Sequence, residues 1–381
     1  MKIIINTTTL SGTGVTQVAV SFINECIDFP ENYYHVFLSK TVARELHINQ
    51  FPNNFCFYYF DSHPLYGIKG FAIRKQLHEM ENKINPDIVF TVFGPACWTP
   101  TSKHVCGFAN SYYVYPDSPF FDVISKIDYL RINIMKFAHK FFLKRNGKYF
   151  ICETEDMTER LHKYLEISRS EVFTVSNTYN NYFVNFKLLD NKSILPPRTN
   201  NEFRFITLAS FEVHKNLTIL NKVIPTLISK YPELNVRFVL TIDHQMYENA
   251  FSIDAKSRII NLGRVDVKKC PQLYHECDAL FLPTLIESFS ANYPEAMIME
   301  RPILTSNYSF AKSICRDAAM YFDPRNPEAV VETIVEIVQN IELRRNLVLK
   351  GKKRVLDFGD AKTRASRYLE VLKIIHFNKI R

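Results

Sequence analysis

Two glutamates, Glu287 and Glu295, lie late in the sequence with seven residues between them. Glu287 follows the apolar run 279–282, which predicts a buried strand, and Glu295 follows Pro294, a residue typical of the first turn of a helix. Free backbone N–H groups and the positive end of the dipole make a helix N-terminus suitable for phosphate. Carboxylates accept hydrogen bonds from hydroxyls, so the pair predicts a site for a ligand that carries both phosphate and sugar. The loop between the strand and the helix adds further candidate contacts, namely Ser288, Phe289, Ser290 and Ala291.

Each glutamate also has a structural explanation. A first-turn glutamate such as Glu295 favours the helix dipole without any ligand. A carboxylate at a buried strand end, as expected for Glu287, needs a partner of some kind because its burial is costly.

Lys215 lies soon after the strand predicted over 203–208. A cation at a helix start opposes the dipole, and a bound phosphate would offset that cost, whereas a solvated lysine is the plain alternative. A second turn, Gly263, Arg264 and Val265, ends another predicted strand. Such a turn could contact a base through main-chain groups, or it could be a simple loop.

The first half of the chain offers a glycine-containing loop, Gly12, Thr13 and Gly14, after its first predicted strand. Glycine allows a backbone to approach a ligand closely, although a plain strand–helix turn also accounts for it. A dinucleotide fingerprint fits poorly, because Gln17 occupies the third glycine position and the strand predicted at 33–39 ends without a carboxylate. We therefore expect neither nicotinamide nor flavin.

Two residues of the first half are candidates for contact with an acceptor. Trp98 is the chain's one tryptophan, and Asn110 follows the strand predicted at 104–108. An aromatic ring and an amide at strand ends suit a sugar, while packing of Trp98 in a core is an equal alternative.

Short apolar runs alternate with helical patterns along the chain, which is typical of α/β proteins with parallel sheets. We predict two Rossmann-like doubly wound domains facing across a cleft, with ligands at the carboxyl ends of the strands. The predicted ranges are an N-terminal acceptor domain at 1–187, a linker at 188–201, a C-terminal donor domain at 202–360 and a helix at 361–381 that packs back on the first domain. The predicted strands lie at 2–6, 33–39, 55–60, 87–92, 104–108, 149–152, 171–175, 203–208, 235–241, 258–262, 279–282, 302–305 and 319–322.

The composition is that of a soluble globular protein. Of the 381 residues, 46% are hydrophobic and 23% are charged, and the formal net charge is +8. The apolar run at 1–5 is too short for a signal peptide, and no stretch approaches the roughly 20 apolar residues that span a bilayer. Eight scattered cysteines without a Cys-x-x-Cys pair predict reduced thiols and a cytoplasmic location.

Segment 126–148 combines apolar residues with seven lysines and arginines. It predicts an amphipathic helix with a basic face, which is either an ordinary solvated face or a peripheral contact with an anionic membrane. Basic residues elsewhere are dispersed and no nucleic-acid motif is present, so we expect no nucleic-acid partner.

Several kinds of site are not expected. No two aspartates are separated by a single residue, so the metal clamp of many sugar transferases is absent, and we expect no required metal. Cys270, His275 and Cys277 have no matching second pair that would complete a zinc site. The chain also has no Walker A loop and no Gly-x-Ser-x-Gly elbow.

Taken together, these residues resemble the retaining glycosyltransferases of family 4, which have the GT-B fold. The resemblance rests on Glu287 and Glu295 at the family's spacing, followed by Ala296-Met297 and Arg301-Pro302, and on Lys215. The turn at 263–265 and the loop at 12–14 match the family's segments beside the nucleobase and the diphosphate. Segment 92–110 is further similar to transferases of bacterial O-antigen and capsule clusters.

The chain departs from the family's pattern at three places. Ser210 stands where members usually carry an arginine, a role that Arg264 could take over. Ser288 and Ser290 replace glycines after the first glutamate, and Asn110 replaces a histidine.

The resemblance implies transfer of a hexose-type sugar from a nucleotide-diphospho-sugar to a lipid-linked glycan at the inner face of the cytoplasmic membrane, without a cofactor. In this account Lys215 holds the diphosphate, Glu287 the donor sugar and Glu295 the ribose. Two alternatives remain open, a GT-B epimerase or phosphorylase and a catalytically silent assembly partner.

Overall fold

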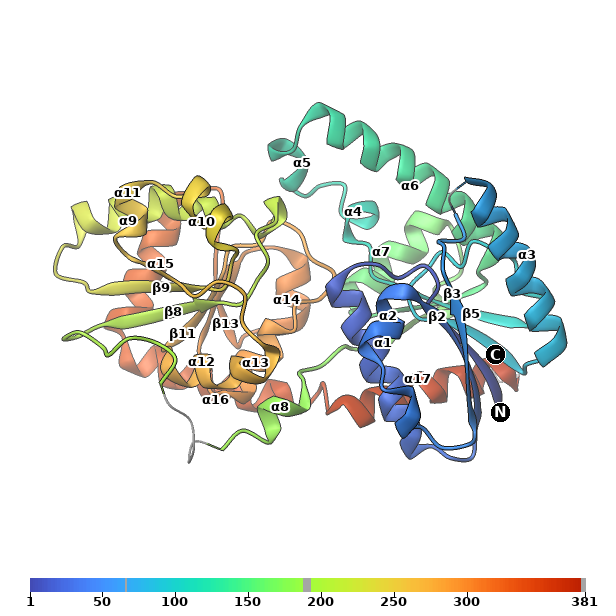
Figure 1. The fold of residues 1–381 in the computed structure, drawn as a ribbon. Helices are drawn as coiled ribbons and strands as arrows, with labels where there is room; N and C mark the ends of the chain where they lie inside the picture. Colours follow the sequence, from blue (N-terminus) through green and yellow to red (C-terminus); the bar gives the residue numbers. More distant parts are fainter. Residues whose placement is uncertain (66, 188–192, 378–381) are drawn as a thin grey trace. The chain divides into compact units, whose positions relative to one another are not determined.

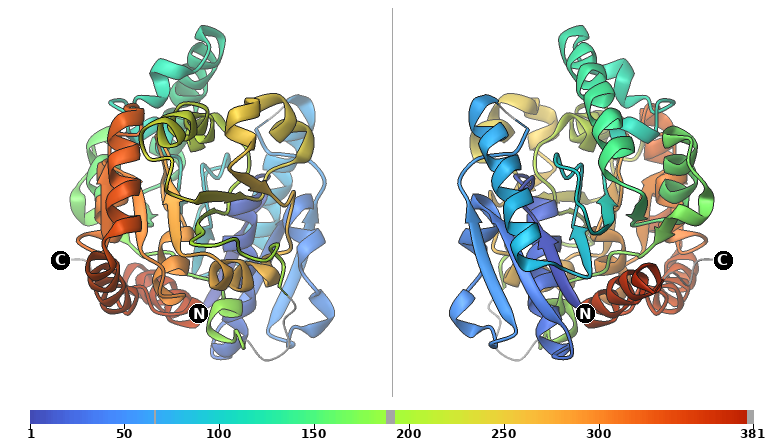
Figure 2. Two further views of the ribbon diagram at one scale, coloured as in Figure 1. Left: turned by 90° about the vertical axis from the view of Figure 1, so that its left-hand side faces the viewer. Right: turned by 90° about the vertical axis from the view of Figure 1, so that its right-hand side faces the viewer.

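The computed structural model describes residues 1–65, 67–187 and 193–377, which fold as two compact units. The first unit comprises 1–115, 125–177 and the residues from 361 onward, and the second comprises 116–124 and 178–360. In each unit helices cover both faces of a parallel sheet (Figures 1 and 2). The predicted α/β class with two doubly wound sheets is therefore confirmed.

The first unit contains a seven-stranded sheet in the order β3-β2-β1-β4-β5-β6-β7. Every neighbouring pair is parallel, and the order reverses at β1, so the carboxyl ends of β1 and β4 border the crevice where such sheets bind ligands. The strands are β1 (Lys2–Asn6), β2 (Tyr33–Ser39), β3 (Phe55–Phe60), β4 (Ile88–Thr91), β5 (Lys103–Phe108), β6 (Tyr149–Cys152) and β7 (Val172–Thr174). Its helices include α1 (Thr13–Glu25), α2 (Lys40–Glu45), α3 (Gly67–Ile84), α4 (Ser111–Val114), α6 (Lys126–Asn146) and α7 (Glu155–Leu165).

The last helix, α17 (Ala361–His376), packs within the first unit. Tyr368 lies edge-on to Phe22 of α1 and tilted against Phe90 of β4, at ring-centroid distances of 5.3 and 5.4 Å. The buried guanidinium of Arg364 donates to Asn177 and, at 2.7 Å, to Ser21. The end of the chain therefore completes the core of the unit that contains its beginning.

The second unit contains a six-stranded parallel sheet in the order β10-β9-β8-β11-β12-β13. Four phenylalanines, one from each of β8, β9, β11 and β13, form the centre of its core, with neighbouring centroids 5.4–6.1 Å apart. The strands are β8 (Phe203–Thr207), β9 (Val236–Leu240), β10 (Ile259–Asn261), β11 (Ala279–Leu282), β12 (Ile303–Ser306) and β13 (Ala319–Phe322). The helices include α8 (Asn181–Val184), α9 (Leu220–Lys230), α10 (His244–Ala250), α11 (Ile253–Lys256), α12 (Cys270–Glu276), α13 (Asn292–Ile298), α14 (Ser309–Cys315), α15 (Pro327–Gln339) and α16 (Ile341–Val355).

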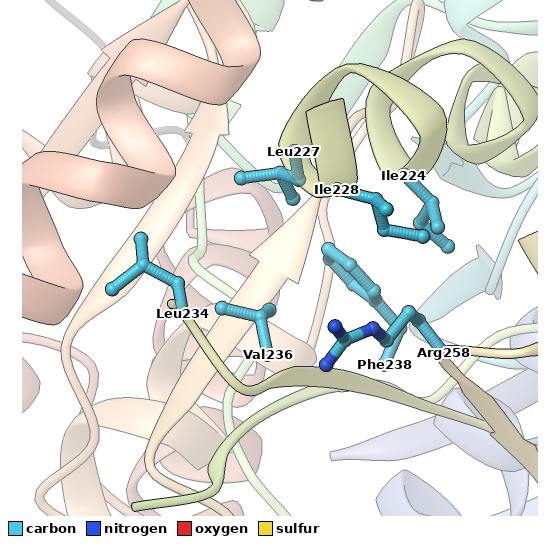
Figure 3. A pocket seen from close by; sticks show the side chains of 7 residues that line it. All are labelled: Ile224, Leu227, Ile228, Leu234, Val236, Phe238 and Arg258. Carbon is cyan, nitrogen blue, oxygen red and sulfur yellow. The ribbon is translucent and has the colours of Figure 1, made fainter. Parts of the chain in front are cut away.

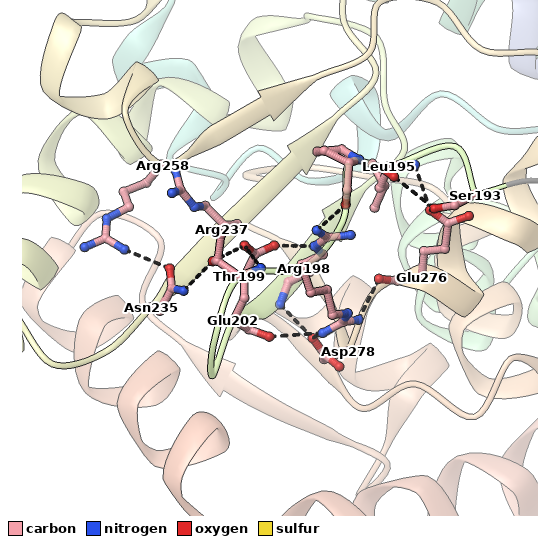
Figure 4. A network of polar contacts seen from close by, with 12 residues as sticks. Ser193, Leu195, Arg198, Thr199, Glu202, Asn235, Arg237, Arg258, Glu276 and Asp278 are labelled. Atoms are coloured by element: carbon pink, nitrogen blue, oxygen red, sulfur yellow. Dashed lines mark hydrogen bonds and ion pairs between the residues drawn. The ribbon is translucent and has the colours of Figure 1, made fainter.

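The predicted linker at 188–201 needs a correction. Residues 188–192 lie outside the described part of the chain, whereas 193–201 are fixed to the second unit by a polar network (Figure 4). The Glu276 carboxylate accepts the backbone N–H groups of Ile194 and Leu195 at 2.9 and 2.7 Å, and Arg198 pairs with Asp278 at 2.7 Å. This stretch is therefore an integral edge of the second unit.

The helical periodicity of the sequence predicts helices over 123–145 and about 215–230, and both begin later in the structure than these ranges. The helix expected from 123 begins at Lys126, because the Ser125 hydroxyl accepts the Asp128 N–H at 3.1 Å and caps it. The helix expected from 215 begins at Leu220, after two single 3₁₀ turns, 213–215 and 217–219. Asn216 separates these turns with a left-handed backbone, φ 54°.

A small apolar recess lies under α9, lined by aliphatic side chains, Phe238 and the stem of Arg258 (Figure 3). Arg258 itself donates to Asn235 at 3.2 Å. The recess is an opening in the core and contains none of the candidate chemical groups. Across the described ranges, no helix is both long and apolar enough to cross a membrane.

Candidate active site

An ion pair between Lys215 and Glu287 joins two of the sequence-predicted site residues. Lys215 follows β8 and Glu287 follows β11, and these strands are neighbours in the sheet, so their carboxyl ends bring the two side chains together. Each side chain is only 14% exposed. The pair therefore places a cation and a carboxylate side by side, both largely removed from water.

The backbone around Lys215 differs from the predicted helix start. Lys215 ends a 3₁₀ turn, and its N–H donates to the Glu212 carbonyl at 2.9 Å, so the expected conflict with a helix dipole does not arise. The adjacent Asn216 amide donates to the Pro324 carbonyl at 2.9 Å, which holds the left-handed residue in place. Ser210 lies exposed before this turn.

The loop after Glu287 presents unused backbone donors. Within the described residues, the N–H groups of Ser288, Phe289, Ser290 and Ala291 make no hydrogen bond to protein. The Asn292 amide, which the sequence did not single out, donates to the Leu208 carbonyl at 3.0 Å and fixes this loop to the end of β8. Successive free amides beside a lysine are suited to phosphate oxygens.

Glu295 occupies the first turn of α13, as its spacing from Pro294 indicated. Its carboxylate makes no hydrogen bond or ion pair to any described residue. Burial raises the pKa of Glu295 to about 8. Its charge also contributes, after burial, to raising the pKa of Cys270 and Tyr274, so the carboxylate faces α12. A desolvated carboxyl without a protein partner is available to a ligand that donates hydrogen bonds.

The turn at Gly263 requires glycine for two reasons. Its backbone is left-handed, φ 71°, and a Cβ added there would lie 2.7 Å from Nε2 of His244. Arg264 is exposed and Val265 is partly buried. Within the described residues Arg264 has no hydrogen bond or ion pair, so its guanidinium is available for a ligand.

Gly12, Thr13 and Gly14 lie at the beginning of α1 in the first unit. Gly12 is the N-cap and has no side chain that could accept a hydrogen bond. No capping side chain therefore pairs with the first backbone N–H groups of this helix. A Cβ at Gly14 would meet nothing within 4 Å, and one at Gly12 would make only an ordinary contact with Val15. The loop is therefore an open surface at a helix N-terminus, and its glycines are not imposed by its own packing.

The prediction that Trp98 contacts an acceptor is wrong. Trp98 is 5% exposed in a hydrophobic core, and its indole N–H donates to the buried Glu81 at 3.2 Å. Glu81 also accepts the backbone N–H groups of Thr101 and Ser102 at 2.8 and 2.9 Å, so the indole is part of a satisfied structural network. The core explanation holds here.

Asn110 lies at the carboxyl end of β5 and precedes α4. Its Oδ1 is buried and finds no hydrogen-bond partner among the described residues. A buried, unsatisfied amide oxygen is uncommon, and a ligand hydroxyl could satisfy it.

The sequence of the second unit matches a known family. Residues 192–354 match the family model described as Glycosyl transferases group 1. The matched region covers less than half of the chain. It contains Lys215, Glu287 and Glu295. The match supports the prediction, made from the sequence, that the protein is a glycosyltransferase.

A curated relative also carries the glycosyltransferase name. An uncharacterized glycosyltransferase of Methanocaldococcus jannaschii, MJ1178, is 24% identical over 136 residues, 34% of this chain. The match covers 39% of that relative, about two fifths of its length.

Solved structures resemble the whole chain and not only the region that matches the family model. A glycosyltransferase from Rickettsia africae has a TM-score of 0.73 at 16% identity, with 98% of each chain covered. Anabaena Alr3699/HepE, solved with UDP-glucose, has a TM-score of 0.68 at 13% identity, covering 98% and 99% of the two chains. WaaG, a glycosyltransferase involved in lipopolysaccharide biosynthesis, has 0.66 at 13% identity, covering 97% and 99%. These likenesses show the GT-B fold, as predicted.

The two glycine sites give a stability test. Gly263→Ala places a methyl group against His244 on a left-handed backbone, so we expect a loss of about 2 kcal/mol in the free energy of unfolding. Gly12→Ala is the matched control, because its φ of −86° and open surroundings accept a methyl group, and its unfolding midpoint in urea should equal that of wild type. Equal midpoints for all three proteins would contradict the strain at Gly263.

Proposed function

We propose that this protein transfers a hexose-type sugar, with retention of configuration, from a nucleotide-diphospho-sugar to a glycan acceptor. The main observation that supports this proposal is the Lys215–Glu287 pair beside the free amides of 288–291. Both lie in the region that matches the family model of group 1 glycosyl transferases. Among its structural neighbours, Anabaena HepE binds UDP and UDP-glucose, which supports a nucleotide-sugar donor.

In this proposal the ion pair exchanges partners when the donor binds. Lys215 turns to the diphosphate, and Glu287 becomes free to accept hydrogen bonds from the sugar hydroxyls. Lys215 and Glu287 are already largely removed from water before the donor binds. The donor therefore replaces the ion-pair partner of each residue, and no water has to be removed from an isolated charge. Lys215 and the loop amides then stabilise the negative charge that develops on the leaving diphosphate.

Other residues take supporting roles. Glu295 accepts the ribose hydroxyls, and the Gly263–Val265 turn lies beside the base. The loop at Gly12–Gly14 contributes its backbone to the diphosphate, and Arg264 supplies the guanidinium missing at Ser210. No divalent metal is needed in this scheme, because the sequence has no Asp-x-Asp pair and a lysine serves as the cation.

For the acceptor we propose a lipid-linked oligosaccharide of surface-polysaccharide synthesis, O-antigen or capsule, at the cytoplasmic side of the membrane. The supporting observation is the surface of α6. Five large apolar side chains at helical spacing are 54–80% exposed: Ile127, Leu130, Ile134, Phe137 and Phe141. Lys126 and Arg131 flank this stripe, while Lys140 and Lys144 pair with Glu166.

This surface differs from the basic face expected from the sequence. An ordinary domain helix turns its apolar stripe toward the core, but only Leu143 and Asn146 of α6 are buried. An exposed apolar stripe bordered by cations suits the headgroup region of an anionic bilayer. We therefore propose peripheral membrane contact through residues 126–148.

One prediction of the proposed function concerns the ion pair. Lys215→Ala should lower kcat for sugar transfer at least 30-fold, because loss of the main cation on the diphosphate costs about 2 kcal/mol or more of transition-state stabilisation. Transfer is measured with radiolabelled nucleotide sugars and membrane-extracted acceptor, after a thermal-shift screen of UDP-, GDP-, ADP- and dTDP-sugars selects the donor. EDTA should leave wild-type activity unchanged.

Lys222→Ala removes an exposed lysine from the same unit and is the matched control, with full activity expected. Melting curves verify that each variant is folded. Full activity of Lys215→Ala would refute the proposed site. Nucleotide binding without any wild-type turnover would favour the silent partner, and phosphate-dependent turnover would favour a phosphorylase.

A second prediction uses the protonation of Glu295. With a pKa of about 8, the free carboxyl is mostly protonated at pH 7, and hydrogen bonds from ribose hydroxyls favour its ionised form. Nucleotide binding at pH 7 should therefore release up to one proton, and affinity should rise with pH until about pH 8. Calorimetry with UDP in two buffers of different ionisation enthalpy measures the release, and Glu295→Gln should show none. An identical release in that variant would assign the proton elsewhere.

A third prediction concerns α6. The protein should sediment with vesicles of phosphatidylglycerol and phosphatidylcholine but not with phosphatidylcholine alone, and 0.5 M salt should weaken the binding. The double variant Ile134→Ala/Phe137→Ala should bind at least tenfold more weakly, since each side chain contributes about 2 kcal/mol on burial. Ile253→Ala, which removes an 87% exposed side chain from the other unit, should bind normally. Equal binding to both vesicle types would sink the proposal.

A further inference from the structure

Residues 116–124 belong to the second unit, although the residues before and after them belong to the first. This segment contains one short helix, α5 (Phe120–Val123). The chain consequently passes between the units at four places, after residues 115, 124, 177 and 360. The contacts of these nine residues explain why they pack in the second unit.

The segment contacts both loops that carry the ion pair. The Ser118 hydroxyl donates to the Leu285 carbonyl at 2.9 Å, two residues before Glu287. The Phe120 ring, 4% exposed, lies edge-on to the ring of His214, next to Lys215, with centroids 6.4 Å apart. Ser118 also accepts the Phe120 N–H at 3.2 Å, which fixes the two contact residues relative to each other.

Each of the three chain segments contacts the other two. The Leu285 N–H donates to the His214 carbonyl at 2.8 Å, while the Leu285 carbonyl accepts from Ser118. Burial, followed by the nearby Lys215, lowers the pKa of His214 to about 4, so the imidazole is neutral at pH 7 and packs against Phe120 as an uncharged ring. These contacts therefore fix the relative positions of three segments, namely the turn at 213–215, the loop at 285–287 and segment 116–124.

We propose that Ser118 and Phe120 are positioning residues for Lys215 and Glu287, supplied to the donor site by a segment from the first half of the sequence. Their contacts with Leu285 and His214 fix the backbone on each side of the pair. The ordering of these loops follows from the contacts themselves, and its effect on turnover rests on the proposed transferase function. Catalysis depends on such support because small displacements of a charged group cost large factors in rate.

Hydrogen exchange followed by mass spectrometry tests the positioning directly. In Phe120→Ala, peptides covering 213–217 and 284–288 should exchange at least tenfold faster than in wild type, and in Ser118→Ala about fivefold faster, as expected for one lost hydrogen bond. Strand β8 should exchange at the wild-type rate. Val123→Ala, a change of a 55% exposed residue in the same segment, is the matched control. Wild-type exchange in Phe120→Ala, or equal acceleration in Val123→Ala, would overturn the proposal.

Kinetics provide the second readout. Ser118→Ala should lower kcat about fivefold with KM for the nucleotide sugar nearly unchanged, and Ser118→Thr, which keeps the hydroxyl, should recover most of the rate. A melting temperature equal to wild type excludes general destabilisation. If wild type shows no turnover, the transferase proposal fails while the exchange data still decide the positioning role. If wild type turns over and Ser118→Ala matches it, the positioning proposal alone fails.

Discussion

The ion pair between Lys215 and Glu287 constrains the whole carboxyl edge of the second sheet. Two charges at 14% exposure are costly to bury, and each is tolerated because the other is present. The pair can form only where the ends of β8 and β11 lie side by side, and the turn and loop that follow these strands must present their side chains toward each other. The Leu285–His214 backbone bond and the Asn292–Leu208 bond maintain that geometry.

The fold could be read from the sequence because its signals are local. Short apolar runs bounded by polar turns located every strand within one or two residues, since strands buried on both faces have little freedom in composition. From the sequence, only the proximity of Lys215 and Glu287 could be predicted, and not the ion pair between them. Both residues follow strands of one sheet, but neither the spacing nor the residue types indicate that they neutralise each other.

Other features depend on contacts between distant parts of the sequence. Trp98 lies in a core because Glu81, on α3, accepts its indole N–H, and no pattern near Trp98 reveals that partner. The helix expected from 215 begins late because Asn216 adopts a left-handed backbone that its amide stabilises through Pro324. The outward apolar stripe of α6 shares its periodicity with a core-facing stripe, so the sequence alone could not assign its direction.

The four passages of the chain between the units also bear on how such proteins evolve. An exchange of residues 178–360 between two relatives, with one breakpoint near 178 and one near 360, would leave behind residues 116–124, which contact the second unit of their own parent. The hybrid would combine loops from one lineage with a positioning segment from another. Segment 116–124 should therefore vary in concert with residues 213–215 and 285–287 rather than with its neighbours in the chain, and recombination that preserves activity should require two further breakpoints around it.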